Sequence, residues 1–354
     1  MSYKVEDPDR NVAIDFCRCI ACIAVVIIHV LAPYWYSTPV LLTSIDEYKV
    51  GGGILIAGTY GWRVCSAIDA LSRFSVPLFV VISGALMLNK KILYQGYIVR
   101  KVLHLISMVF FWGLVYAVFG VFLDLLSGRP IEWIAKAEMF FLGPGVFWFI
   151  FMLIPLYITS PILKHILNER GLSRLYIVLW FFLTLIFDSV KVWIPQLSRI
   201  AHFSYIGLFP IYSGYFMIGG YFEKYGIKRK YENILIGMGC LSLVVMLIGK
   251  PEGYFHNFTT PFAAIYTMAI MVVAHRIDWN KIDPNINNMI MVFSKYTVGI
   301  YALHILMLNI LTAILQNNDK MWALQIIFLV FVSILASLGI TIVIKKIPLI
   351  RKIV

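Results

Sequence analysis

Long apolar segments, separated by short polar breaks, occupy almost the whole chain. A helix needs roughly 20 predominantly apolar residues to cross roughly 30 Å of hydrocarbon. The predicted spans are 12–34, 72–89, 102–126, 146–163, 175–190, 205–222, 234–249, 260–275, 290–314 and 322–344. This pattern predicts an all-α polytopic membrane protein with about ten transmembrane helices. It also predicts that residues 1–354 form one transmembrane domain, without a separate soluble domain.

The longest break lies between the first two predicted spans, from Tyr36 to Leu71. It contains Gly51-Gly52-Gly53, which indicates a flexible turn and lacks the pattern of a phosphate-binding loop. Its second part, Trp62 to Leu71, is predicted to form a short interfacial helix.

Composition and charge agree with a bilayer environment and set an orientation. Of 354 residues, 61% are hydrophobic and 14% are charged, and the mean hydropathy is +0.85. With the N-terminus inside, 19 of the 30 Lys and Arg residues fall on the cytoplasmic side and 8 on the outer side. Cytoplasmic loops carry this excess, so both termini are predicted to be cytoplasmic. The net charge of +12 is spread over short segments, which argues against nucleic acid as a partner.

The five cysteines do not form a disulfide pattern. Cys17, Cys19 and Cys22 share the first span, and their positions on a helix do not converge on one point. A metal site is therefore less expected than close packing of small residues. We expect no metal.

The first predicted span carries three ionisable side chains at helical spacing. Asp15 and Arg18 are three residues apart and share one helix face. His29 follows Arg18 by eleven residues, close to three turns, so these two share a face and stand about 16 Å apart along the axis. Arginine suits phosphate binding and histidine suits proton transfer. The alternative is that Arg18 only anchors the helix at the interface and His29 only packs.

The second predicted span begins with Ser72-Arg73 and contains Pro77 and Ser83-Gly84. Proline and the Ser-Gly pair favour a bent helix, as is tolerated beside a cavity. Arg73 follows Asp69 by four residues. The two form either a simple interfacial ion pair, worth little energy, or part of a site.

Polar groups also occur in the third and ninth predicted spans. Tyr301 and His304 share a face near the middle of the ninth span, where they either pack helices together or belong to a site. Arg100, Lys101 and His104 begin the third span on the predicted cytoplasmic side. They fit a phosphate cradle or ordinary positive-inside anchoring.

Taken together, these stretches resemble the acyltransferase-3 family, the bacterial integral-membrane acyltransferases that modify cell-envelope glycans. The resemblance rests on Asp15 and Arg18 with His29, on Ser72-Arg73 before Val76-Pro77-Leu78-Phe79 and Ile82-Ser83-Gly84, on Phe147-Trp148-Phe149 with Tyr157 and Pro161, and on Gly299-Ile300-Tyr301 with His304. The chain is most similar to stand-alone O-acetyltransferases, such as those acting on enterobacterial common antigen. An esterase-like domain after the last span is not expected, which leaves the acceptor open.

The resemblance implies transfer of an acyl group, usually acetyl, from cytoplasmic acyl-coenzyme A to a sugar hydroxyl. Acetyl-CoA or another acyl-CoA would be the donor substrate, and a lipid-linked or outer-face glycan the acceptor. The bacterial inner membrane is the expected location, with membrane lipids as further partners.

The resemblance also implies roles for individual residues. His29 would act as general base on the acceptor hydroxyl or as a covalent acyl carrier, and Arg73 would stabilise the oxyanion or orient the sugar. Arg18, with Arg100 and Lys101, would bind the donor phosphates. The supporting residues expected around them are Asp15, Ser83, Trp148, Tyr301 and His304.

Two other classes of protein remain open at this stage. A transporter or flippase for a lipid-linked sugar also has many spans and buried charges, although paired inverted repeats are not evident here. A non-catalytic membrane sensor would use the same scaffold without chemistry. A second class of membrane acyltransferases, which modifies lipids and proteins, also relies on a buried histidine, but its companion asparagine and long cytoplasmic loops have no clear counterpart.

Overall fold

A computed structural model describes most of the chain. The described residues are 11–35, 53–91, 93–194, 210–249, 252–315, 320–348 and 350–351. Gly51 and Gly52 of the predicted turn, and residues 205–209 at the start of the sixth predicted span, lie outside this part.

The described regular structure is helical throughout. The helices are α1 (Val12–Trp35), α2 (Tyr60–Ser72), α3 (Ser75–Leu88), α4 (Gln95–Leu126), α5 (Trp133–Leu142), the 3-10 turn η1 (Gly145–Phe147), α6 (Trp148–Asn168), α7 (Arg170–Trp180), the π-helical η2 (Phe181–Ile186), α8 (Phe187–Trp193), α9 (Ser213–Tyr225), α10 (Arg229–Ile248), α11 (Glu252–Phe255), α12 (Pro261–Arg276), the 3-10 turn η5 (Trp279–Lys281), α13 (Pro284–Ser294), α14 (Thr297–Leu315) and α15 (Trp322–Lys345). Within the described ranges, eight helical segments are long and apolar enough to cross a membrane. The shorter α9 and α12 correspond to two more predicted spans, so the polytopic all-α fold is confirmed.

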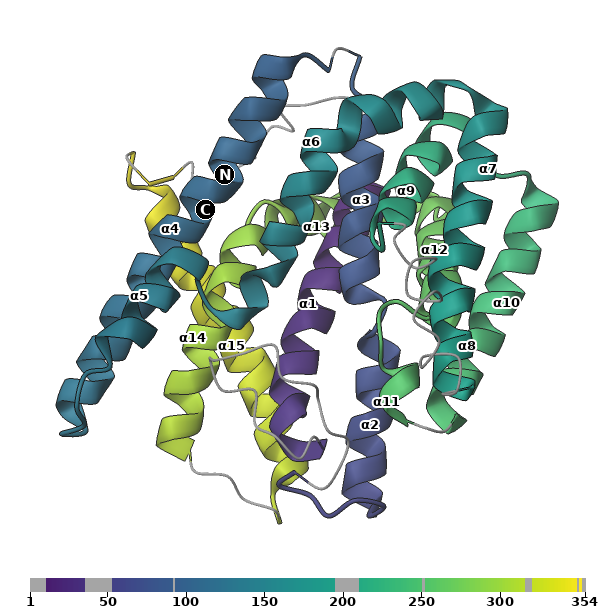
Figure 1. Ribbon diagram of the computed structural model, residues 1–354. Coiled ribbons are helices and arrows are strands. Elements are labelled where there is room, and N and C mark those ends of the chain that lie inside the picture. Colours follow the sequence, from purple (N-terminus) through teal and green to yellow (C-terminus); the bar gives the residue numbers. More distant parts are fainter. Residues whose placement is uncertain are drawn as a thin grey trace.

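Helix α1 occupies the middle of the bundle (Figure 1). It contacts α2, α3, α12, α13, α14 and α15. Apolar side chains exposed on peripheral helices, such as Leu241 on α10 and Phe331 on α15, face outward, where lipid would cover them. Polar side chains on α1 are therefore surrounded by other helices instead of lipid.

The second predicted span is part of a longer, interrupted helix. Helix α2 ends at Ser72 and α3 begins at Ser75, and together they form one 29-residue segment, Tyr60–Leu88. Pro77 explains the interruption, because its ring clashes with the carbonyl of the residue four positions earlier, which is Arg73. The predicted interfacial helix exists, but Cys65 and Asp69 on it are completely buried, so it is part of the bundle.

The ninth predicted span is also interrupted, which corrects the continuous helix expected over 290–314. Helix α13 ends at Ser294 and α14 begins at Thr297. At the break, Lys295 N–H donates to Val292 and Tyr296 N–H to Phe293, the tighter pattern of a 3-10 turn. The Thr297 hydroxyl donates to the Ser294 carbonyl over 3.0 Å, which competes with a continuous helical ladder.

The structure also contains a helix that the sequence analysis did not predict. Helix α5 packs along the neighbouring α4 and leads through η1 into α6. Its ten residues are too few to span a bilayer alone, which is why the hydropathy pattern did not reveal it.

Helices α3 and α9 approach each other backbone to backbone. A Cβ added at Gly84 would lie 1.9 Å from the Phe216 carbonyl oxygen, and one at Gly219 would lie 1.8 Å from the Val81 carbonyl oxygen. Small residues allow this close approach between membrane helices. The contact therefore requires glycine on both sides.

Replacing Gly219 with leucine is expected to destabilise the bundle, because the obstacle is backbone that cannot rotate away. Overpacking costs typically about 1–3 kcal/mol, and a backbone obstacle places this site at the upper end or above. Thermal unfolding in detergent measures the effect. Gly237→Leu on α10 is the matched control, since nothing lies within 4 Å of its added Cβ. Equal unfolding temperatures for both variants would contradict the assignment.

Candidate active site

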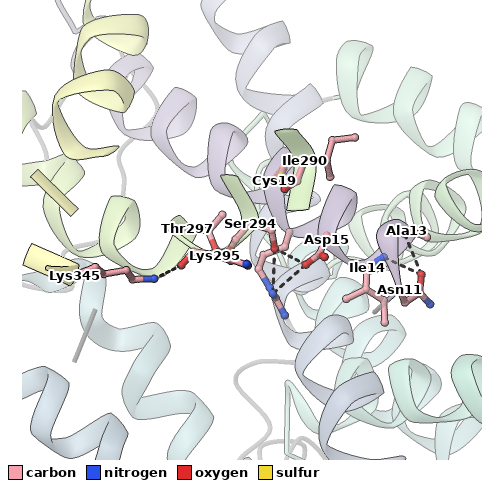
Figure 2. A network of polar contacts seen from close by, with 11 residues as sticks. Asn11, Ala13, Ile14, Asp15, Cys19, Ile290, Ser294, Lys295, Thr297 and Lys345 are labelled. Carbon is pink, nitrogen blue, oxygen red and sulfur yellow. Dashed lines mark hydrogen bonds and ion pairs between the residues drawn. The ribbon is translucent and has the colours of Figure 1, made fainter. Parts of the chain in front are cut away.

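One polar cluster joins the start of α1 to the end of α13 (Figure 2). The Ser294 hydroxyl donates to the Asp15 carboxylate over 2.6 Å, and Arg18 Nη1 donates to Ser294 Oγ over 3.1 Å. Arg18 also pairs with Asp15 at 3.4 Å, as their spacing on one helix predicts. Asp15 is buried, whereas the Arg18 side chain is 26% exposed. A guanidinium held this way is fixed in position and still accessible to an anion.

The cysteines of α1 bind the backbone around the break between α13 and α14. Cys19 Sγ donates to the Ile290 carbonyl over 3.4 Å, and Cys22 Sγ to the Thr297 carbonyl over 3.7 Å. Among the described residues, no group of three or more His, Cys, Asp or Glu side chains could hold a metal ion. These contacts support a packing role for the two thiols.

Farther along α1, His29 lies against His304 of α14. The ring centroids are 5.1 Å apart, so two helices distant in sequence bring the two histidines together. His304 Nδ1 lies 2.6 Å from the Tyr301 carbonyl oxygen. A carbonyl can only accept, so Nδ1 carries the proton, and in the neutral ring Nε2 is the basic nitrogen.

Each ring of this pair also carries a nitrogen that is left unpaired. His29 Nδ1 and His304 Nε2 are buried and have no hydrogen-bond partner in the described part of the protein. Leaving a buried polar atom unpaired costs about 1–3 kcal/mol, and such atoms in a folded protein call for an explanation. A substrate group that pairs with them provides one.

Tyr116 of α4 opens the backbone of α14 beside His304. In a regular helix the Leu306 N–H would donate to the Ala302 carbonyl. Here the Tyr116 hydroxyl stands between them, because it donates to the Ala302 carbonyl over 2.9 Å and accepts from Leu306 N–H over 3.1 Å. A side chain inserted into the helical ladder distorts the helix locally. Tyr116 therefore sets the backbone of the turn that carries His304, and the sequence analysis missed it.

Tyr301 holds its place through its neighbours. Its hydroxyl donates to the Val146 carbonyl, and its ring stacks on Phe147 with centroids 6.0 Å apart. Tyr301 thus supports His304 through its own carbonyl and fixes α14 against η1. The Tyr301 and His304 rings lie side by side, with centroids 6.0 Å apart, and the supporting role expected of Tyr301 stays a prediction.

A second buried polar cluster lies near the end of α1. Arg73 donates to Asp69 through Nε at 2.6 Å and through Nη2 at 2.9 Å. His256 Nδ1 lies 2.5 Å from the same carboxylate, and His256 Nε2 lies 3.3 Å from Ser66 Oγ. The ion pair considered from the sequence is present, but it is buried and shared with His256, since Asp69, Arg73 and His256 are all at most 5% exposed.

No sequence signal points to His256, because the residue follows the short α11 and no spacing relates it to Asp69. Its ring also lies 4.4 Å from that of Trp35, at the end of α1. The second cluster therefore contacts the end of α1, the helix that also carries His29.

An aromatic row connects the second cluster to α6. The Arg73 guanidinium lies over the Phe258 ring at 5.1 Å, and Phe258 stacks on Trp148 with centroids 6.4 Å apart. Trp148 also faces Tyr212 at 5.8 Å. Trp148 therefore lies beside Arg73 through one intervening ring.

Ser83 and Tyr157 lie between α3 and α6. The Ser83 hydroxyl donates to the Phe79 carbonyl over 2.8 Å and interacts with the Tyr157 phenol, which is also within electrostatic reach of Arg18. Ser83 is thus linked to Arg18 through Tyr157, which stands between them.

Arg100 and Lys101 lie apart from the histidine pair, on the exposed start of α4. Arg100 donates to the Tyr94 hydroxyl and to the Gly96 carbonyl, the latter over 3.2 Å. Lys101 lies 5.8 Å from the centre of the Tyr97 ring. Their described partners are thus aromatic rings and backbone of the same region.

The fold and these clusters define a multi-pass membrane protein with a polar centre inside its helix bundle. The model of a family described as an acyltransferase domain matches residues 11–342, nearly the whole chain. The chain belongs to this family, acyltransferase 3, as its motifs predicted. The protein is therefore a membrane acyltransferase, which acts with an acyl donor and an acceptor. No significant match was found among curated proteins or among solved structures.

Removal of the Tyr116 hydroxyl is expected to reduce acyl transfer much more than stability. Tyr116→Phe loses two hydrogen bonds, but α14 can close its ladder, so the free energy of unfolding should fall by only about 1 kcal/mol. The turn carrying His304 then shifts, and we expect at least a tenfold lower transfer rate. Tyr176→Phe, which loses a hydrogen bond to Ser213 between α7 and α9, is the control. Equal transfer rates in the two variants would contradict a positioning role.

Separating the charges of Asp69 and Arg73 should destabilise the protein strongly. Asp69→Ala leaves a buried guanidinium without its carboxylate, which costs about 3–5 kcal/mol. The double variant Asp69→Leu, Arg73→Met removes both charges and should unfold at a higher temperature than Asp69→Ala. A double variant as unstable as the single one would contradict charge burial as the cause.

Proposed function

We propose that this protein transfers an acetyl group from cytoplasmic acetyl-CoA to a hydroxyl of a cell-envelope glycan. The observation that carries the proposal is the pair of adjacent histidines, His29 and His304. Their rings lie 5.1 Å apart, and each ring carries a buried nitrogen without a hydrogen-bond partner among the described residues. A basic nitrogen held without a protein partner is suited to take a proton from a substrate hydroxyl.

The donor would approach from the Arg18 end of α1. Arg18 is held by Asp15 and Ser294 and remains partly exposed, as a phosphate-binding arginine requires. The rise of a helix places it about 16 Å from His29 along the axis. The pantetheine arm of coenzyme A would extend over this length, with the phosphates near Arg18 and the thioester near His29.

The reaction then joins the acceptor oxygen to the acetyl carbonyl. As the hydroxyl oxygen attacks the thioester, its proton passes to His29, and the carbon–sulfur bond breaks in the following step. The leaving thiolate takes the proton back as the free thiol of coenzyme A. Arg73 would supply the positive charge that stabilises the negative carbonyl oxygen of the intermediate.

The acceptor would enter from the Arg73 end. Trp148, Phe258 and Tyr212 form an aromatic row there, and aromatic faces are suited to the apolar faces of sugars. The excess of Lys and Arg in the loops of the opposite side supports an outer position for this end, and both termini would then be cytoplasmic in a bacterial inner membrane. Residues 1–354 would act as one transmembrane domain.

Replacing His29 with alanine is expected to reduce acetyl transfer by about 10²–10⁴-fold, the usual contribution of a general base. Radiolabelled acetyl-CoA is supplied to membranes at matched expression, and label in the glycan fraction is counted. His304→Ala should lower transfer in the same direction. His275→Ala on α12 is the control, since His275 donates to the Met271 carbonyl away from the pair.

The same experiment separates the alternatives. Label in the glycan that is unchanged by His29→Ala would reject the role of His29. Intact mass spectrometry shows whether the protein itself gains one acetyl group. A gain that is absent in His29→Ala would favour a covalent carrier over a general base. No transfer from any acyl donor, together with transport of a lipid-linked sugar or a phenotype insensitive to His29→Ala, would favour a transporter or a sensor.

A further inference from the structure

A cationic cleft lies at the end of α6, on the Arg18 side of the bundle. The cavity has a volume of about 350 Å³ and is lined by Lys91, Leu93, Pro161, Lys164, His165 and Asn168. Of these residues only Pro161 belongs to the motifs of the sequence, and none belongs to the site described above.

The described part of the chain offers the basic side chains of the cleft polar partners but no carboxylate. Lys164 Nζ donates to the backbone carbonyls of Lys90 and Lys91, and Lys224 Nζ donates to Asn168 Oδ1 over 2.6 Å. Within the described residues, Lys91, Lys164 and Lys224 form no ion pair with a carboxylate. The positive charge that gathers here is therefore available to an anionic ligand.

The cleft continues toward the candidate active site along one face of α6. Tyr157, Pro161, Lys164 and Asn168 recur at intervals of four, three and four residues, which places them on the same side of the helix. Tyr157 is within electrostatic reach of Arg18. Lys164 lies seven residues beyond Tyr157, which is about 10 Å farther along the axis of α6.

We propose that this cleft, through Lys91 and Lys164, binds the 3′-phosphate of the acyl donor's nucleotide. The inference rests on the proposed function and makes the binding of coenzyme A more specific. Coenzyme A carries phosphate in two places, a diphosphate next to the pantetheine arm and a phosphate on the ribose at the far end. Arg18 then holds the diphosphate, and the more distant cleft holds the 3′-phosphate. Arg100 and Lys101 are not required for either contact.

The test compares acetyl-CoA with acetyl-3′-dephospho-CoA, which lacks only this phosphate. For the wild type, the KM for acetyl-3′-dephospho-CoA should be about tenfold higher than the KM for acetyl-CoA. This is the change in affinity expected when one hydrogen bond to a charged group is lost. In Lys91→Gln the two KM values should become nearly equal, with the KM for the dephospho donor unchanged. Lys164→Gln should behave alike. Lys230→Gln, an exposed lysine of α10 on the same side, should keep the wild-type difference.

A binding measurement keeps this test independent of catalysis. Purified protein is titrated with adenosine 3′,5′-bisphosphate and with adenosine 5′-monophosphate. Wild type should bind the bisphosphate about tenfold more tightly, and Lys91→Gln should lose that preference. If the wild-type protein transfers acetyl from neither donor but still prefers the bisphosphate over the monophosphate, the proposed function is overturned and the nucleotide site stands. Normal transfer without any preference for the 3′-phosphate would overturn the cleft and leave the proposed function standing.

An anionic lipid headgroup has the same phosphate chemistry and must be distinguished from the donor. Both measurements are therefore repeated in nanodiscs of phosphatidylcholine and of phosphatidylglycerol. A preference for the 3′-phosphate in neutral lipid supports the nucleotide site. An effect of Lys91→Gln that appears only in phosphatidylglycerol, equally with both donors, would show a lipid site and would overturn the proposal.

Discussion

Two buried carboxylates, Asp15 and Asp69, determine how the central helices are arranged. A bilayer offers no water to solvate a charge, so each carboxylate must find its partners within the protein. Asp15 on α1 is hydrogen-bonded to Ser294 at the end of α13. Asp69 on α2 is hydrogen-bonded to His256, which follows α11. These two contacts lie at opposite ends of α1, and the histidine pair lies between them. The polar partners therefore fix the register in which α14 meets α1.

Helix interruptions supply the rest of the geometry. Pro77 ends α2 so that Arg73 lies at the junction with α3, and the break before Thr297 lets the thiols of α1 reach backbone carbonyls. Tyr116 opens a further turn within α14. Each irregularity exposes backbone groups that a neighbouring helix satisfies. Non-helical backbone at membrane depth is tolerated only where protein or a cavity surrounds it, so these breaks mark the part of the bundle that is not in contact with lipid.

The sequence was sufficient for the features that depend on local periodicity. Hydropathy located the spans, and helical spacing paired Asp15 with Arg18. The ordered motifs placed His29 and His304 in one site, and the structure brings their rings together. Contacts between segments far apart in sequence could not be inferred, because no single spacing encodes them. His256 and Tyr116 act through such contacts, as does the burial of Asp69, and the cleft at Lys164 depends on the mutual approach of α3 and α6.

The glycine contact between α3 and α9 has a consequence for how the protein can vary. Side chains that collide can usually be accommodated by shrinking the neighbour, but Gly84 and Gly219 face carbonyl oxygens, which every residue carries. No second substitution at Phe216 or Val81 removes the obstacle. A genetic screen for suppressors of Gly219→Leu should therefore return revertants to small residues at position 219 rather than compensating changes across the interface. During evolution, α3 and α9 can therefore keep their close contact only if positions 84 and 219 both stay glycine.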